Sequence, residues 1–288
     1  MTTIYSGLVS GALYALVAVG YNIVFVPTGT FNFAQAQFVM VGTFVAWLGL
    51  VFFHWPLVLT IAIGLLVGGL IGLIEERTAI RLLPGSGVHG ELVTTVGVGV
   101  VIEGLANVLF GSNAQSVPSL ITNDSAVTIL NGRIFPSEIL MIGTALIVVF
   151  LADQGSRRTR IGLASLATAE DKTAAVLRGI NVSRLSIGAY MLAGGLCVAF
   201  GPFIASATFA QTSLGDALAL KGFVALAIGG FGSQRGALIG GMTAGMLEAL
   251  VARYLNANFQ NLAVLILLLI VLSIRPHGLF GRGEGRVV

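Results

Sequence analysis

Apolar residues fill this chain in long blocks that short polar segments separate. Blocks of about 20 residues can cross a bilayer as helices, whereas the strands of a membrane β-barrel alternate between apolar and polar positions. The run from Leu262 to Ile274 has no such alternation. The pattern therefore predicts an all-α polytopic membrane protein. We expect spans at 4–26, 33–53, 57–76, 92–110, 137–152, 185–207, 236–255 and 259–275.

A shorter apolar piece at 217–231 is compatible with either a ninth span or a half-helix. The chain is therefore expected to contain about eight to nine transmembrane helices. Glycines recur at four-residue spacing, for example at Gly7/Gly11, Gly64/Gly68/Gly72 and Gly241/Gly245. Such spacing lets helix backbones approach one another closely, so it predicts a compact bundle.

The distribution of basic residues predicts the orientation. Cytoplasmic loops of membrane proteins are rich in Lys and Arg, and both the segment 153–184 and the tail after Ile274 have this character. The segment 111–136 carries little charge and is expected outside. Counting spans backwards from 153–184 puts the N-terminus outside, and a cytoplasmic C-terminus then requires 217–231, or another unrecognised piece, to cross. The charges used are Arg157, Arg158, Arg160, Lys172, Arg178 and Arg184 against Asp153, Glu170 and Asp171, and Arg275, Arg282 and Arg286 against Glu284.

Composition excludes several classes of function. Hydrophobic residues make up 56% of the chain and charged residues 9%, and the basic residues are scattered through short loops, so nucleic-acid binding is not expected. Cys197 is the only cysteine, and the three histidines, His54, His89 and His277, are far apart, so neither a metal site nor a cofactor is predicted. The chain has no phosphate-binding loop and no hydrolase motif. We therefore expect no enzymatic activity, and any ATP would be hydrolysed by another subunit.

A few ionisable residues fall within the predicted spans. Glu103 and Glu248 lie inside them, and Lys221 and Arg253 lie closer to their ends. Because a charge in lipid costs at least about 2.5 kcal/mol, each is either functional or bonded to a neighbouring helix. An alternative function is therefore a stand-alone ion-coupled secondary transporter or channel that uses Glu103 or Glu248.

Three amides stand together where the second apolar block resumes. If this span begins near Asn32 on the cytoplasmic side, Thr28, Thr30 and Asn32 can cap its free N–H groups. Asn32 and Gln35 are three residues apart and share a helix face, which points either to a protein seam or to the translocation path. Gln37 points elsewhere and is expected to bond to a neighbouring helix.

The basic segment 157–181 resembles a docking element more than a solvated loop. A helix-forming stretch from Leu163 to Leu177 is followed by a break at 178–181 and re-entry into the membrane. This order predicts a short amphipathic element parallel to the bilayer. It would either dock in a groove on a partner or lie on lipid headgroups. A second glycine-rich turn, GGFGSQRGALIGG at 229–241, carries Arg235 and is expected to face the cytoplasm.

Several motifs together resemble one family of membrane proteins. They are GLVSGALYALVAVGYNIVF at 7–25, Asn32-Phe33-Ala34 with Met40-Val41-Gly42, the Glu170-Asp171 and Gly179-Ile180-Asn181 positions, and GGFGSQRGALIGG. In this order they look like the H-type membrane-spanning subunits of branched-chain amino-acid ABC importers. The family often has His and Glu where this chain has Gln35 and Gln37, which puts in doubt any role that needs titration there.

The resemblance implies a type II-like ABC importer permease, with residues 1–288 forming one transmembrane domain in the bacterial plasma membrane. It implies two ABC ATPase subunits, a second permease subunit and an extracytoplasmic solute-binding protein as partners. The solute would be a branched-chain amino acid or a related small polar molecule. Asn32, Gln35 and Gln37 are candidates for the substrate path. Within the cytoplasmic segment 153–184, coupling to the ATPase would fall on Ala169, Glu170, Asp171, Gly179, Ile180 and Asn181.

Overall fold

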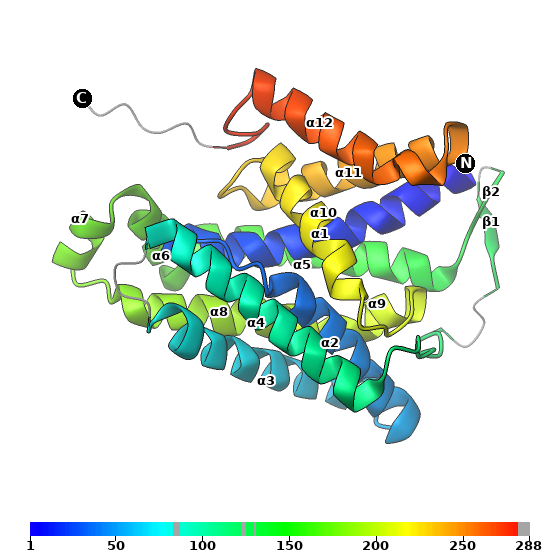
Figure 1. The fold of residues 1–288 in the computed structure, drawn as a ribbon, viewed down its shortest axis with the longest axis horizontal. Helices are drawn as coiled ribbons and strands as arrows, with labels where there is room; N and C mark the ends of the chain where they lie inside the picture. Colours follow the sequence, from blue (N-terminus) through cyan, green and yellow to red (C-terminus); the bar gives the residue numbers. More distant parts are fainter. Residues whose placement is uncertain (83–86, 122–124, 130, 282–288) are drawn as a thin grey trace. The chain divides into compact units, whose positions relative to one another are not determined.

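The computed structural model describes residues 1–82, 87–121, 125–129 and 131–281. The tail residues Arg282, Glu284 and Arg286, which entered the predicted orientation, lie outside this range. The apolar blocks form helices, as their length and continuity predict (Figure 1). Their bounds are α1 (Thr2–Thr28), α2 (Gln35–Trp47), α3 (Leu57–Glu75), α4 (Gly87–Phe110), α5 (Pro136–Arg158), α6 (Arg160–Glu170), α7 (Lys172–Leu177), α8 (Val182–Ala199), α9 (Gly201–Ala207), α10 (Leu214–Gly229), α11 (Gln234–Tyr254) and α12 (Gln260–Ile274).

The prediction of an all-α polytopic membrane protein is confirmed. Among the described residues, seven helical segments are long and apolar enough to cross a membrane. α10 and α11 together would make an eighth, but they meet at a bend of 120°. The apolar piece at 217–231 corresponds to most of α10, which has 16 residues. Two π-helical turns, Leu48–Phe52 and Glu76–Ile80, extend α2 and α3.

A short hairpin interrupts the helical pattern in the segment 111–136. Strands β1 (Val127–Ile129) and β2 (Gly132–Ile134) pair antiparallel, with Val127 opposite Ile134. The sequence analysis did not predict it. The Arg133 backbone N–H donates to Thr2 Oγ1 at 3.3 Å. The start of α1 therefore lies beside the segment that is expected outside.

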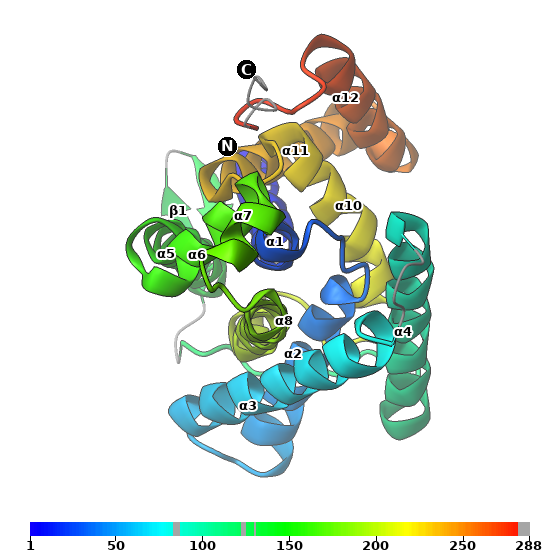
Figure 2. The same ribbon diagram turned by 90° about the vertical axis from the view of Figure 1, so that its left-hand side faces the viewer.

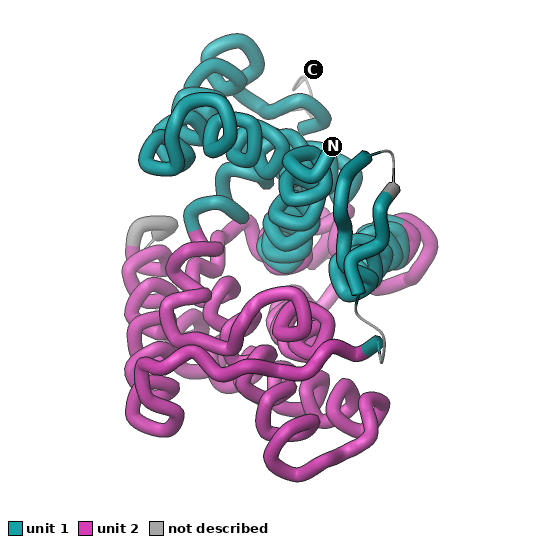
Figure 3. The backbone as a smooth tube through the Cα atoms, turned by 90° about the vertical axis from the view of Figure 1, so that its right-hand side faces the viewer, with its two compact units in different colours: residues 1–22, 121–153, 220–288 teal, residues 23–120, 154–219 magenta. Residues whose placement is uncertain are grey.

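The chain divides into two compact units (Figure 3). Unit 1 contains residues 1–22, 121–153 and 220–288, and unit 2 contains residues 23–120 and 154–219. Three helices, α1, α5 and α10, contribute residues to both units. The two units are described separately below.

Glycines bring α1 and α11 together in unit 1. A Cβ placed on Gly245 would lie 2.3 Å from the backbone nitrogen of Gly11, and one on Gly7 would lie 2.9 Å from the Cα of Met246. Only a glycine leaves room for backbones at these separations. The close packing that the four-residue glycine spacing predicts is therefore present here.

A second glycine seam holds unit 2 together, where α3 packs along α8 (Figure 1). A Cβ on Gly68 would lie 2.2 Å from the Gly194 carbonyl oxygen, and one on Gly72 would lie 2.3 Å from that of Tyr190. α2 packs against both of these helices. The seam fixes the neighbours of α2, which carries two of the three predicted path residues.

Candidate functional site

The chain leaves helical geometry before α2, and this break shapes the site. Residues 29–34 are not α-helical, although Asn32 and Ala34 are fully buried. Backbone of this kind is tolerated at membrane depth only where protein or water covers it. The predicted capping of the second span is wrong: α2 begins at Gln35, and its N-cap residue, Ala34, makes no side-chain cap. Instead, Asn32 Oδ1 accepts from the Ala34 N–H at 2.9 Å and stabilises the turn.

Asn32 and Gln35 both face protein within unit 2. Asn32 Nδ2 donates to Glu75 Oε2 at 2.9 Å. Gln35 Nε2 lies 3.1 Å from the Ala193 carbonyl oxygen and 3.0 Å from Cys197 Sγ. Both amide side chains are 0% exposed. Of the two environments that the sequence left open, these bonds favour the protein seam.

Two buried carboxyl groups were missing from the residues predicted to matter. Glu75 and Glu76 lie where α3 passes into its π-helical turn, and both are buried. Among the described residues, Glu75 Oε1 and Glu76 Oε2 have no hydrogen-bond partner. In the sequence the pair stands at the very end of an apolar block, where charged residues ordinarily reach the interface. That position gave no signal that the pair is buried.

Gln37 makes contacts in unit 2 that are separate from those of Asn32 and Gln35. Its Nε2 donates to Asp216 Oδ1 at 2.7 Å, so the predicted bond to a neighbouring helix is present. The amide lies between two glycines: a Cβ on Gly215 would lie 2.0 Å from Gln37 Oε1, and one on Gly99 would lie 3.6 Å from Gln37 Cγ. The starts of α2 and α10 and the middle of α4 therefore meet at this side chain.

A second carboxyl group joins this contact from α4. Glu103 follows Gly99 by one helical turn, so both lie on the same face of α4. The Glu103 carboxyl lies close enough to that of Asp216 for the two to interact electrostatically. Asp216 is exposed and Glu103 is partly exposed. The sequence singled out Glu103 but missed Asp216, which lies one residue before the apolar piece at 217–231. We call Gln37, Glu103 and Asp216 the acidic cluster.

Unit 1 holds a different kind of charged contact. Lys221 Nζ lies 2.6 Å from Glu248 Oε1, and the Tyr14 hydroxyl donates to Glu248 Oε2. Lys221 Nζ also lies 5.4 Å from the centre of the Tyr14 ring, a cation–π contact. Both oxygens of Glu248 are therefore bonded and its charge is compensated. We call Tyr14, Lys221 and Glu248 the ion-pair cluster.

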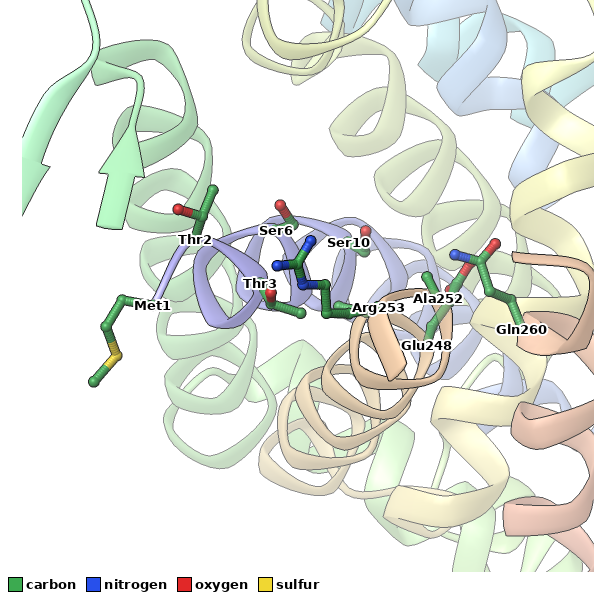
Figure 4. A pocket seen from close by; sticks show the side chains of 10 residues that line it. Met1, Thr2, Thr3, Ser6, Ser10, Glu248, Ala252, Arg253 and Gln260 are labelled. Atoms are coloured by element: carbon green, nitrogen blue, oxygen red, sulfur yellow. The ribbon is translucent and has the colours of Figure 1, made fainter. Parts of the chain in front are cut away.

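A pocket of about 530 Å³ opens next to the ion-pair cluster in unit 1 (Figure 4). In Figure 4 the Arg253 side chain extends from α11 towards Ser6 on α1. Since Lys221 already neutralises Glu248, Arg253 supplies the remaining charge of the lining. The pocket is lined by Met1, Thr2, Thr3, Ser6, Ser10, Glu248, Ala249, Ala252, Arg253 and Gln260.

The predicted docking segment forms two short helices, α6 and α7, beside the start of α8 (Figure 2). The single helix expected over 163–177 is wrong, because Asp171 is extended (φ −151°, ψ 104°). Its carboxylate caps α7, accepting from the backbone N–H groups of Thr173 at 2.8 Å and Ala174 at 2.9 Å. Asn181 caps α8 in the same way through the Arg184 N–H at 3.0 Å. Gly179 turns the chain between them with a φ of 85°, as the predicted break requires.

Most of this segment lies at the surface. Of the six predicted coupling residues, Ala169, Glu170, Asp171, Gly179 and Asn181 are exposed and Ile180 is partly exposed. Two large apolar side chains are also exposed here. Leu177 ends the helix-forming stretch that the sequence marked for docking, whereas Ile161 lies before that stretch and was not singled out. Ile161 is 71% exposed and Leu177 is 83% exposed. Exposed apolar side chains on capped short helices fit both alternatives that the sequence left open, a groove on a partner and the lipid headgroups.

Comparisons with known proteins agree with this architecture. A family model described as the permease component of branched-chain amino acid transport systems matches residues 3–274. LivH, a high-affinity branched-chain amino acid transport permease of Salmonella typhimurium, is 29% identical, with 97% of this chain and 95% of the relative covered. BraD of Pseudomonas aeruginosa, a permease of the same description, is 27% identical over 97% of this chain and 95% of its own.

One solved structure aligns over most of the chain. It is PsaBC from Streptococcus pneumoniae in complex with Fab, with a TM-score of 0.49, 14% identity and coverage of 96% of this chain and 93% of the other. Similarity at this level supports no conclusion about function. The family model, by contrast, spans nearly all of the helical region. The chain is therefore a multi-pass membrane protein that belongs to the ABC transporter permease family of branched-chain amino acid transport systems.

Proposed function

We propose that this chain is one membrane-spanning subunit of an ATP-driven importer of branched-chain amino acids or a related small polar solute. A second permease subunit would complete the path, two ABC ATPases would drive it and an extracytoplasmic binding protein would deliver the solute. Both compact units would belong to one permease domain in a bacterial inner membrane. The family match over residues 3–274 carries this proposal.

The α6–α7 segment is the proposed ATPase-coupling element. Asp171 and Asn181 fix the ends of α7 and α8 through caps, so the exposed apolar side chains between them are held in place. Rigid presentation suits a helix pair that must transmit the closing of an ATPase dimer to the spans attached to it. Ile161 and Leu177 would bury their exposed side chains against the ATPase.

The contacts support an orientation with the N-terminus outside and the C-terminus in the cytoplasm. Arg235 Nε lies 2.9 Å from Asp153 Oδ2, which joins two segments that the charge pattern assigns to the cytoplasm. Ala210, shortly before α10, pairs with Gln115 of the segment expected outside. At the other end of α10, the Gly229 carbonyl oxygen accepts from the Phe280 N–H of the C-terminal tail. We propose that α10 crosses the membrane and that α11 returns.

The substrate path would involve Gln37 more directly than the other two amides. Asn32 and Gln35 are fully buried and bonded to Glu75 and to α8, so their role would be to hold the broken segment before α2. Gln37 lies next to exposed carboxyl groups. We expect Gln35→Ala to lower the stability of the subunit, with normal transport per folded molecule.

A co-purification experiment tests the proposed function. The chain is expressed with its ATPases and second permease, and Leu177→Glu in α7 should abolish ATPase association while membrane insertion stays normal. Arg133→Glu, which reverses an exposed charge in the β2 strand, is the matched control and should leave the complex intact. A Leu177→Glu complex that stays together and hydrolyses ATP on addition of the binding protein would refute the coupling assignment.

The alternative of a stand-alone ion-coupled transporter loses one of its two candidate carboxyl groups. In unit 1, Glu248 is bound to Lys221 and Tyr14. A carboxyl group that already has a fixed cationic partner is poorly suited to bind and release a coupling ion. Uptake of leucine by the purified chain alone in liposomes, driven by a proton or sodium gradient without ATP, would favour this alternative instead.

A further inference from the structure

The acidic cluster lies where contact with lipid would carry a high free-energy cost. Glu103 is within the span Gly90–Phe110, about 10 Å along the helix axis from its last residue. Asp216 stands in the first turn of α10. A carboxylate exposed to hydrocarbon costs about 2.5 kcal/mol or more, and two adjacent acids raise that cost. This face of α4 and α10 must therefore meet water or a polar partner.

The described residues do not balance the charge of either carboxyl group with a salt bridge. In the described part of the chain, no lysine or arginine forms a salt bridge with Glu103 or Asp216. Two carboxylates this close repel each other when both are ionised. A cationic group that entered the cluster would relieve this repulsion by bonding to both acids.

Gln37 completes the cluster. It is only 4% exposed and donates to Asp216 through Nε2, while its Oε1 has no hydrogen-bond partner among the described residues. α2 and α10 both begin after non-helical segments, 29–34 and 208–213. Backbone that leaves helical geometry next to a span is tolerated where it lines a polar cavity or is covered by protein.

We propose that Gln37, Glu103 and Asp216 line the translocation path and bind the primary ammonium group of the amino-acid solute. This inference rests on the proposed function and adds the location and chemistry of one contact. An ammonium group has three N–H donors, and the cluster offers two carboxyl groups and one amide oxygen as acceptors.

The helix dipole alone does not account for the cluster. An acid in the first turn of α10 stabilises that helix, which is sufficient reason for Asp216. Glu103 lies well inside α4, where the helix dipole gives no such benefit. Its position against Asp216 therefore needs a partner that both acids share.

Charge-selective cysteine labelling tests the inference in the complete transporter in membrane vesicles. Cys197 is first replaced with alanine, and Glu103→Cys, Asp216→Cys and Val101→Cys are then made separately. Val101 is 60% exposed and, two residues from Glu103, points about 200° away on α4, so it is the matched lipid-facing control. Water-soluble methanethiosulfonates of either charge are the probes.

We expect Glu103→Cys and Asp216→Cys to react, with a cationic-to-anionic rate ratio about tenfold above that of a free thiol in solution because one acid remains. Val101→Cys should stay unlabelled by both. Absence of labelling at 103 and 216, or a rate ratio equal to that of the free thiol, would overturn the inference. Wild-type protein that does not assemble with the ATPases would refute the proposed function instead, so the two failures are distinguishable.

Where a cysteine variant does not accumulate, Glu103→Gln and Asp216→Asn provide a second measurement. The KM for leucine uptake, with the binding protein saturating, should rise at least about fivefold in Asp216→Asn, while Val101→Ala leaves KM unchanged. An unchanged KM in both amide variants would also overturn the inference.

Discussion

The two charged clusters within the spans differ in how their charge is balanced. In unit 1, the ion-pair cluster places Lys221 against Glu248 and caps the second carboxylate oxygen with Tyr14. In unit 2, the acidic cluster brings Glu103 and Asp216 together with a neutral amide. Glu248 is buried, whereas Asp216 is exposed. Compensated and buried charge suits a structural contact, and uncompensated exposed charge suits a ligand.

The largest expected effect on stability comes from breaking the ion-pair cluster. Lys221→Met leaves the Glu248 carboxylate buried without its cation, which should cost about 3 kcal/mol. The measurement is the thermal unfolding of the purified complex. Lys221→Met combined with Glu248→Met removes both charges and should recover most of the loss. A single variant as stable as the wild type would contradict the structural role.

Glu248→Gln tests the same ion-pair cluster by removing the acid instead of the base. The amide keeps a bond to Tyr14 and loses the charge that Lys221 pairs with, so we expect a loss of about 2 kcal/mol. Because Lys221 is partly exposed, water can solvate part of its charge, and the effect should stay below that of Lys221→Met. Arg253→Gln is the control for removing a charge nearby and should change stability by less than about 0.5 kcal/mol.

A smaller stability effect is expected for the amide of the acidic cluster. Gln37→Ala removes the hydrogen bond to Asp216 and leaves a space beside Gly215, which should cost about 1 kcal/mol. Leucine uptake should also weaken, with a higher KM. Gln37→Glu is the informative companion, because it adds a third acid and should destabilise the cluster more than alanine does. If Gln37→Ala lost more stability than Gln37→Glu, the result would argue against charge repulsion in the acidic cluster.

Asp216→Asn should have the smallest effect on stability, within about 0.5 kcal/mol, because the side chain is exposed and an amide can still accept from Gln37. Its transport effect should be clear, since the ammonium group loses a charged partner. Asp216→Glu keeps the charge and should retain more uptake than asparagine. A stability loss as large as that of Lys221→Met would place Asp216 among the structural contacts.

The helical type of the spans and most of their places followed from the sequence because a membrane helix is encoded locally by apolar length. The breaks did not. The non-helical segment 29–34 contains apolar residues as well as Asn32, and its burial depends on Glu75, 43 positions away in sequence. The β1–β2 turn contains Asn131 with a φ of 59°, a conformation that asparagine tolerates, and this turn was not predicted from the sequence.

The residues of the acidic cluster were predicted only in part. Local sequence marks some of them, whereas contacts between distant positions define the others. Polar residues inside an apolar block, such as Gln37 and Glu103, stand out in sequence. Asp216 stands at the edge of a block, and its bond to Gln37 spans 179 positions. Asp171 and Asn181 were marked by family resemblance, and their capping roles emerge only from helix ends that the structure defines.

The central claim is that one charged cluster holds the fold and the other contacts the solute. Lys221→Met and Asp216→Asn, reconstituted in parallel with the full complex, test it when Tm and leucine uptake per folded molecule are both measured. We predict that Lys221→Met lowers Tm and leaves uptake per folded molecule near normal, while Asp216→Asn keeps Tm and loses uptake. Two variants that change the same quantity in the same direction would contradict the account.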